Sequence, residues 1–515
     1  MDWTEGYVQE IDYTHGYYRE LAPAHLDFAC LSRGISTLLE FRPLRYLELA
    51  FGQGMSVNIH AAACPGEFWG FDFNPTHAVN ARDLATACGS GAQLFDDSFE
   101  EFASREDVPE FDVIVMHGTW SWISAENRHL VVDIVRRKLA PGGVFYMSYN
   151  CWPGWATEMP LRHLLVEHAA LASPDARGLI PKIDAAMDFA QAMIDADARY
   201  FRTHPGLKDW LAKMRSLSRN YVAHEYFNRD WHPMPSSEVA RTLSAAKLTY
   251  AASATLAEHL DGLGLPPKSR DLLAGITHPL LRETVLDYLV NQRFRRDIFV
   301  KGPRPLSPAA RNERFRSLPL ALIQHPDHVP MKLSVAGGEA ELHPDVYRPF
   351  IEAMAEDGYA PKTLRQLEAH PKCGKMHLNE LIQAAQMLVG AGSLHPAQPQ
   401  PAIDAAARHC EALNDRILDR AALTDNVAAL ASPVLGAGVF AARQEMLFLR
   451  AIKRGIKTPE LMAQHAWECL DANGQRLVVK DKTLNDPREN LERLLTDAKA
   501  FETVRLPVLK ALKVA

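Results

Sequence analysis

The residues with the clearest chemical potential lie in a short turn near the start of the chain. An apolar run at 46–50 leads into the sequence ELAFGQG (48–54), which predicts a buried parallel strand that enters a helix through a glycine-bearing turn. Asp72 follows about 20 residues after these glycines, at the end of a second apolar run, where a carboxylate can accept hydrogen bonds from both ribose hydroxyls of a nucleoside. The spacing therefore predicts a nucleoside site.

The acid inside this turn favours one class of nucleoside cofactor. A helix N-terminus that binds a pyrophosphate would place phosphate charge beside the carboxylate of Glu48, whereas S-adenosylmethionine has no phosphate and carries a positive amino group. The run resembles the E/D-x-G-x-G-x-G turn of class I methyltransferases, with Ala50 in place of the first glycine. This substitution puts a methyl group where the backbone usually approaches the ligand closely.

Composition limits the class of protein. The chain has 515 residues, of which 47% are hydrophobic, so it can build several full domains. Its net charge of −7 lacks the basic balance of most nucleic-acid binders. Seven scattered cysteines argue against a disulfide framework. The N-terminus shows no basic and apolar leader, and no window of about 18 uncharged apolar residues occurs, so we expect a cytoplasmic protein without membrane insertion.

Strand and helix patterns alternate after the turn. Strands are predicted at 67–72, 92–97, 111–118 and 143–150, and helices at 24–41, 75–88 and 124–139. This alternation predicts an α/β fold with a doubly wound, Rossmann-like parallel sheet, whose ligands bind at the carboxyl ends of the strands. The expected cofactor-binding residues are Glu48, Ala50, Gly52, Gly54, Asp72, Phe73, Asp97, Ser98, His117 and Gly118. Asp97 and Ser98 could instead cap a helix at 99–103.

The loops after the fourth and fifth predicted strands are unusually aromatic. Rings at this edge suit the stem and the cation of a lysine side chain, although they could equally pack against the next helical segment. Two tyrosines that precede the first strand could close over the cofactor. The residues expected to line a substrate channel are Tyr17, Tyr18, His117, Trp120, Trp122 and Tyr149.

Later segments complete the predicted fold. Strands at 248–254 and 295–301 could supply a sixth strand and an antiparallel seventh, which would make the helices from 159 to about 232 an insertion. Three short helices between 343 and 394 have a winged-helix-like order, and the chain past 401 is expected to be helical, including the apolar stretch 427–440. The predicted units are a methyltransferase core at 1–157, a helical middle insertion at 158–236, the completion of the sheet at 237–303, a winged-helix-like domain at 304–400 and a helical region at 401–515.

Two further stretches carry a family resemblance. Together with the glycine turn, SYNCWPGW (148–155) and YVAHEYFNRDW (221–231) look like the bacterial methyltransferases that carry a methyltransferase regulatory domain, a family that includes the rickettsial-type lysine methyltransferases of outer-membrane proteins. The resemblance implies a seven-stranded class I sheet, S-adenosylmethionine as methyl donor and a C-terminal region that contributes to substrate binding. Within the second stretch, Tyr221, His224, Glu225 and Tyr226 could touch substrate or only lock the insertion to the sheet.

These observations favour a protein lysine N-methyltransferase. A lysine that enters an aromatic, poorly hydrated channel has its pKa lowered by desolvation, so that no strong general base is required. The expected partner is a protein substrate, no nucleic acid is expected, and a homodimer is compatible with the long C-terminal region.

Three other interpretations remain. The acceptor could be a small molecule, or the chain could be a winged-helix DNA-binding protein with a non-catalytic methyltransferase domain. The second is disfavoured because 374–397 contains only one lysine, Lys375, and no arginine. His370, Cys373 and His377 have loosely metal-like spacing, but a structural zinc site needs four ligands, so no metal is expected.

Overall fold

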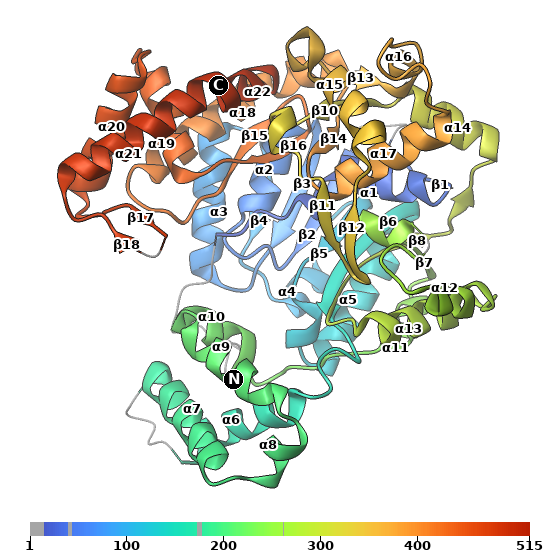
Figure 1. Cartoon of the computed structure of the whole chain (residues 1–515). Coiled ribbons are helices and arrows are strands. Elements are labelled where there is room, and N and C mark those ends of the chain that lie inside the picture. Colours follow the sequence, from blue (N-terminus) through green and yellow to red (C-terminus); the bar gives the residue numbers. More distant parts are fainter. Residues whose placement is uncertain (1–14, 40–43, 173–177, 261, 481) are drawn as a thin grey trace.

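The centre of the molecule is a twisted sheet surrounded by helices (Figure 1). The computed structural model describes residues 15–39, 44–172, 178–260, 262–480 and 482–515. The seven strands follow one another in the order β4 (Gln93–Phe95), β3 (Gly66–Phe71), β2 (Leu44–Leu49), β5 (Phe111–Met116), β6 (Leu139–Asn150), β8 (Phe294–Lys301) and β7 (Leu248–Ser253).

Strand direction confirms the predicted class of fold. β8 lies between β6 and β7 and runs antiparallel to both, while β4, β3, β2, β5 and β6 pair in parallel. The two late strands expected at 248–254 and 295–301 are therefore the sixth strand and the antiparallel seventh. The α/β, Rossmann-like, seven-stranded sheet of the sequence analysis is confirmed.

Alternation along the strands builds a core on each face of the sheet. In β5, Val113 and Val115 belong to one core, whereas Ile114 and Met116 belong to the other. The helices that contribute to the first core include α1 (Pro23–Ser32), α2 (Met55–Ala63) and α3 (Pro75–Cys88), and those in the second core are α4 (Phe99–Ser104), α5 (Ala125–Lys138) and α11 (Ser236–Ser244). Both faces are thus covered, as a largely parallel sheet requires.

The helix predicted at 24–41 is shorter than expected. α1 ends at Ser32, and Gly34 adopts a left-handed conformation with φ of 71°. The chain then forms β1 (Ile35–Ser36), which pairs with β9 (Arg304–Pro305) from the segment directly after β8. The glycine is the physical reason for the break, since its backbone enters this region without a steric cost.

Helices between β6 and β7 form a separate lobe below the sheet in Figure 1. They are α6 (Met159–Leu171), α7 (Leu179–Asp195), α8 (Arg199–Thr203), α9 (Gly206–Ser216) and α10 (Arg219–Tyr226). The lobe has its own apolar core, which also takes in Trp122 and Trp155 from loops at the sheet edge. Between the lobe and β8 lie α11, β7, α12 (Pro267–Ala274) and α13 (Pro279–Val290). The predicted domain boundaries stay a prediction.

The segment from 304 to 396 packs on the first face of the sheet, shown in yellow and orange in Figure 1. After β9 its elements are α14 (Pro308–Ser317), β10 (Pro319–Leu322), the hairpin β11 (Lys332–Val335) and β12 (Gly338–Glu341), α15 (Pro344–Tyr359), β13 (Lys362–Thr363), α16 (Leu364–Glu368), α17 (Leu378–Gly390) and β14 (Leu394–Pro396). The three expected helices are present, but the strand that pairs with both β13 and β14 is β10, which precedes them. The winged-helix order stays a prediction.

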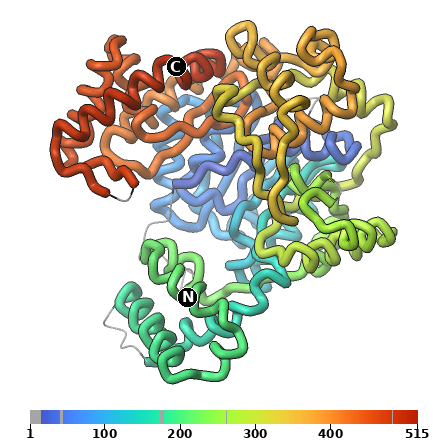
Figure 2. The backbone as a smooth tube through the Cα atoms, viewed as in Figure 1, coloured from blue at the N-terminus to red at the C-terminus, as the bar shows by residue number. Residues whose placement is uncertain are grey.

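The C-terminal region packs against α2 and α3, and Figure 2 shows it beside the first quarter of the chain. Its elements are α18 (Gln400–Ala421), β15 (Ala429–Ser432), β16 (Ala437–Phe440), α19 (Arg443–Lys453), α20 (Pro459–Ala472), β17 (Val478–Val479), β18 (Lys482–Thr483), α21 (Pro487–Ala500) and α22 (Leu506–Ala511).

The helix expected at 427–440 is wrong. This stretch is the antiparallel hairpin of β15 and β16, with Ser432 opposite Ala437. Pro433 and the left-handed Gly436, with φ of 62°, make the turn between the strands. A short apolar run alone does not distinguish a buried strand from a buried helix, so the proline and glycine were the informative residues.

Other features agree with a reduced protein. All seven cysteines are free. Within the described residues, no helix has the length and apolar character needed to cross a membrane.

A buried arginine joins β8 to α13. Arg295 of β8 contacts Asp297 at 2.9 Å, Asp287 at 2.6 Å and Glu283 at 3.0 Å, and all four side chains are largely shielded from solvent. Tyr149 of β6 donates a hydrogen bond of 2.7 Å to Asp297. Removing the cation would leave several carboxyl groups in a poorly solvated site without a counter-charge.

We expect Arg295→Leu to lower the free energy of unfolding by about 3–5 kcal/mol, because breaking one partner of a buried ion cluster leaves uncompensated charge. Urea unfolding followed by circular dichroism measures the loss. The matched control is Arg304→Leu on the exposed β9, which should change stability by less than about 0.5 kcal/mol. Equal stability of the two variants would contradict the structural role of the cluster.

Candidate functional site

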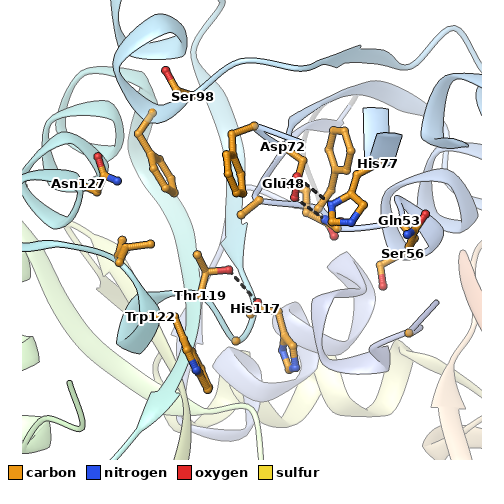
Figure 3. Close-up of a pocket in the computed structure, with 18 of the residues that line it drawn as sticks. Glu48, Gln53, Ser56, Asp72, His77, Ser98, His117, Thr119, Trp122 and Asn127 are labelled. Atoms are coloured by element: carbon orange, nitrogen blue, oxygen red, sulfur yellow. Dashed lines mark hydrogen bonds and ion pairs between the residues drawn. The ribbon is translucent and has the colours of Figure 1, made fainter. Parts of the chain in front are cut away.

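A cavity opens at the carboxyl ends of β2, β3 and β5, where the sequence placed a nucleoside (Figure 3). Glu48, Asp72 and His77 gather on one side of it, and His117 and Trp122 lie on another. Of the ten residues expected to bind the cofactor, eight line this cavity: Glu48, Ala50, Gly52, Asp72, Phe73, Ser98, His117 and Gly118.

The turn after β2 is left-handed at three positions. Gly52 and Gly54 have φ of 57° and 74°, and Ala50 has φ of 54°. A left-handed conformation costs a residue with a Cβ about 1–2 kcal/mol, which explains why glycine suits the position of Ala50. The left-handed φ of Ala50 shows that the turn keeps its shape although this glycine is replaced. Gly54 serves packing instead, since a Cβ there would lie 2.4 Å from the Cβ of Ala81 on α3.

Asp72 is fixed at the end of β3 by the turn itself. Its Oδ2 accepts a hydrogen bond of 2.8 Å from the backbone N–H of Gly52, and its Oδ1 accepts one of 3.0 Å from Asn74. His77 Nδ1 lies 3.0 Å from the same Oδ1. Asp72 is only 4% exposed and lines the cavity. Its hydrogen bonds position the carboxylate before any ligand enters.

Glu48 is a buried acid in the same wall. The hydroxyl of Tyr46 donates a hydrogen bond of 3.1 Å to its Oε2. Burial raises the pKa of Glu48 to about 8, so the ligand-free carboxyl is mostly protonated at neutral pH. A cationic group placed beside it would favour the ionised form, which is what the amino group of S-adenosylmethionine supplies.

His117 directly follows β5 and lines the cavity. Its Nδ1 lies 2.9 Å from the hydroxyl of Tyr146, and its ring stacks on Tyr18 with 3.8 Å between ring centroids. Burial lowers the pKa of His117 to about 3, so the ring is neutral at physiological pH. A neutral ring can lie near a sulfonium ion without charge repulsion.

A second chamber adjoins the first. Its wall shares Tyr18, His117, Gly118 and Trp122 with the cofactor cavity and adds Asn150, Trp155, Asn220, Tyr221, His224, Glu225, Arg293 and Phe294. The stretch 221–231 thus contributes to a cavity wall, and Tyr226 of the same stretch packs in the core of the lobe. The two chambers therefore share part of their walls.

Three residues expected in the channel lie elsewhere, which corrects the sequence prediction. Tyr17 is buried against the C-terminal region, where its hydroxyl accepts a hydrogen bond of 2.8 Å from the N–H of Gly438. Trp120 is fully buried in the second core with its Nε1 3.3 Å from Met234 Sδ, and Tyr149 bonds to Asp297. In each case packing against a later segment, invisible in the local sequence, determines the direction of the ring.

Two expected cofactor ligands also have other roles. Gly54 faces α3, as described above. Asp97 lies two residues beyond the end of β4 and forms a bidentate ion pair with Arg105. Ser98 lines the cavity and also caps α4 in a capping box with Glu101. The cap that the sequence offered as an alternative is therefore present.

Several wall residues were missed. Gln53, Ser56, His77, Phe99, Asn127 and Asp230 line the first cavity. Gln53 lies in the turn and Phe99 follows Ser98, so the positions next to the strand ends could have indicated them. Asp230 comes from the segment after α10, and no local pattern marks it.

The metal interpretation finds no support in the described part of the chain, where no group of three or more potential ligands occurs. His370 contacts Glu356 at 3.0 Å, and His377 caps α17.

The side chains that line the cavity suit S-adenosylmethionine. Asp72 is placed for ribose hydroxyls, Glu48 suits a cationic amino group because it ionises beside one, and Phe73 and Phe99 offer apolar surface for a base. The described wall of this cavity contains no lysine or arginine, the residue types that usually meet a pyrophosphate.

Comparisons with known proteins agree with this geometry. The model of the methyltransferase domain family matches residues 47–143, and that of the predicted methyltransferase regulatory domain matches residues 218–301. An uncharacterized protein from Synechocystis is 38% identical over 517 residues, which span all of both chains. An uncharacterized protein from Rickettsia prowazekii is 23% identical over 402 residues, 72% of this chain and 69% of that protein.

One solved structure resembles the whole chain. PKMT2 from Rickettsia typhi in complex with AdoHcy superposes with a TM-score of 0.69 at 17% identity, covering 98% of this chain and 99% of that chain. At this identity the likeness shows the fold alone.

We expect Asp72→Asn to weaken S-adenosylmethionine binding by about 10- to 100-fold, because hydrogen bonds to a charged acceptor contribute about 1.5–3 kcal/mol. Titration calorimetry measures the affinity. The control is Asp96→Asn, an exposed carboxylate that pairs with Arg82 at 2.8 Å next to the same strand ends. If both variants bind as tightly as the unchanged protein, Asp72 is not a ligand of the cofactor.

A second prediction concerns pH. Because Glu48 is protonated below about pH 8 and a bound cation favours its ionised form, S-adenosylmethionine binding at neutral pH should release a proton. The affinity should rise by up to about tenfold per pH unit between about pH 6 and pH 8 and then level off. Calorimetry at pH 7 in two buffers of different ionisation enthalpy counts the proton.

The control for the pH experiment is a pair of matched variants. Glu48→Gln should abolish the proton release, whereas Glu67→Gln, an exposed acid on β3, should keep it. Binding by the unchanged protein with no proton released at any pH in this range would show that Glu48 does not face the cationic group.

Proposed function

This chain belongs to the family of S-adenosylmethionine-dependent methyltransferases that carry a methyltransferase regulatory domain, and on that premise we propose that it is a protein lysine N-methyltransferase. The observation that carries the proposal is the second chamber, which abuts the cofactor cavity through Tyr18, His117, Gly118 and Trp122. An acceptor bound in the second chamber would lie next to the cofactor cavity.

The walls of the second chamber suit a lysine side chain. Aromatic rings from Tyr18, Trp122, Trp155 and Tyr221 can pack along an aliphatic stem and attract a cation at its end. The resemblance of 148–155 and 221–231 to rickettsial-type lysine methyltransferases supports the same acceptor class.

The chain's own residues orient the reactants. S-adenosylmethionine, when bound, supplies a methyl group on a sulfonium ion that a neutral amine can displace. Asp72 and Glu48 hold one end of the cofactor cavity, while His117 and Tyr18, stacked on each other, border both chambers. Transfer requires the amine nitrogen in line with the breaking carbon–sulfur bond, and a fixed boundary between the chambers sets that approach.

A small-molecule acceptor is the other candidate within the same enzyme class. The aromatic wall of the second chamber would contact a free amine as well as a lysine side chain. The acceptor experiment below separates the two.

We expect the purified protein with S-adenosylmethionine to methylate lysine in an extract of bacterial cell-surface proteins, and mass spectrometry of the digested extract should locate methyl-lysine. Acetylating the lysines of the extract beforehand should abolish the product, since acetylation removes the nucleophile. The Asp72→Asn variant should lose most of the activity, whereas Asp96→Asn should keep it. Methyl transfer only to the small-molecule fraction, with none to protein, would overturn the lysine proposal and leave the cofactor assignment intact.

A further inference from the structure

One acid in the second chamber has no counter-charge. Glu225 lies on α10, half-buried, and among the described residues no ion pair or hydrogen bond is formed by its side chain. Burial raises the pKa of Glu225 to about 7. A carboxyl group kept in a poorly solvated wall without a partner is costly, which makes it a candidate for binding a ligand.

The arginine in the wall of the second chamber already has binding partners. Arg293, in the same wall, forms an ion pair of 2.7 Å with Glu158, and its guanidinium lies 4.1 Å from the ring centroid of Trp155. Its charge is thus shared with another acid and an aromatic face. Glu225 therefore offers its carboxyl to whatever enters the chamber.

Asn150 supplies a second polar group in this wall that is available to a ligand. Asn150, the last residue of β6, is only 4% exposed and lines the chamber, and its Nδ2 has no hydrogen-bond partner among the described residues. Its backbone is held in place, because its N–H donates to Ser121 Oγ at 2.9 Å and its carbonyl accepts from Met234 at 3.0 Å. A half turn of the amide would present Oδ1 to an amine.

α10 is anchored rather than free. Ser218 caps its start, Arg219 pairs with Asp184 of α7 at 2.6 Å, and Arg162 of α6 donates to the carbonyl oxygens of Tyr226 and Asn228. The position of Glu225 relative to the chamber is therefore set by two other helices of the lobe.

We propose that Glu225, assisted by Asn150, binds the ammonium group of the acceptor in the second chamber and takes one of its protons before methyl transfer. This rests on the proposed function. The carboxylate accepts a proton from the alkylammonium ion, leaving a neutral amine with its lone pair. The amine nitrogen then forms a bond to the methyl carbon as the carbon–sulfur bond breaks, and the electron pair of that bond goes to sulfur. The product is a methylammonium ion, and Glu225 returns its proton to water.

Other titratable and charged groups of the chamber wall must be separated from Glu225. They are Tyr18 from the N-terminal segment, His117 after β5, Arg293 before β8, and Tyr221 and His224 on α10 itself. The lowered pKa of His117 and the raised pKa of Tyr221 lie away from neutrality. A titration near pH 7 that disappears with Glu225→Gln is therefore assigned to Glu225.

The first test measures binding without turnover. With the cofactor product AdoHcy present, n-butylammonium should bind to the unchanged protein, and Glu225→Gln should weaken it by about tenfold or more, as expected for a charge-assisted contact. The matched control is Glu167→Gln, an exposed acid on α6 of the same lobe. Unchanged S-adenosylmethionine affinity in both variants shows that the fold and the cofactor cavity are intact.

The second test uses the pH profile of methyl transfer. For the unchanged protein kcat/KM should fall about tenfold per unit below about pH 7, and Glu225→Gln should lose this limb while Glu167→Gln keeps it. Butylammonium binding that is absent, or equal in Glu225→Gln and the control, overturns the inference. Binding that depends on Glu225 with no methyl-lysine formed by the unchanged protein leaves the inference standing and overturns the lysine proposal.

Discussion

The hydrogen-bond ladder between β6 and β8 is the constraint that brings the wall of the second chamber together. It pairs Val144 with Val300 at one end and Asn150 with Phe294 at the other, across an insertion of more than one hundred residues. Asn150 is therefore next to Phe294 and Arg293 by register, although the residues are far apart in sequence. A shift of one residue would turn every side chain of β8 to the opposite face and move Arg295 out of its cluster of acids.

Buried acids give the site its electrostatic character. Glu48 in the first chamber and Glu225 in the second are both raised in pKa by burial, and neither has a cation beside it among the described residues. An acid of this kind is neutral while the chamber contains no cation and becomes a strong partner once a cation enters, because the same low polarity that penalises an isolated charge strengthens a pair. The cofactor is a cation, and so is the lysine side chain that we propose as acceptor, so the same physical device would serve both chambers.

Much of the cofactor side could be predicted because its signal is local. The turn that contains Gly52 and the carboxylate of Asp72 are fixed by a strand, a tight turn and the end of the next strand, all within one supersecondary unit. Positions at strand ends identified eight of the wall residues. The prediction failed where a local interaction competes. Asp97 pairs with Arg105, the residue directly after α4, and does not line the cavity.

The acceptor side could not be predicted in the same way because tertiary packing decides it. Trp120, Trp122 and Trp155 lie in two similar aromatic segments and Tyr149 lies near the end of β6, yet of these four only Trp122 and Trp155 line the second chamber. Trp120 instead contacts Met234 in the segment before α11, and Tyr149 bonds to Asp297 of β8. The role of Glu225 was left open for a related reason, since a single acid in a helix carries no periodic signal.

The apolar core of the lobe supports a ring that borders both chambers. Trp122 lines both of them and also belongs to the apolar core of the lobe. Trp155, in the same core, packs edge-to-face on Trp231 with ring centroids 5.1 Å apart, while its indole N–H donates to the carbonyl of Arg293 at 3.0 Å. Trp122 is thus held by the same apolar core that holds Trp155 and α10. The wall that the two chambers share therefore rests on the packing of the lobe.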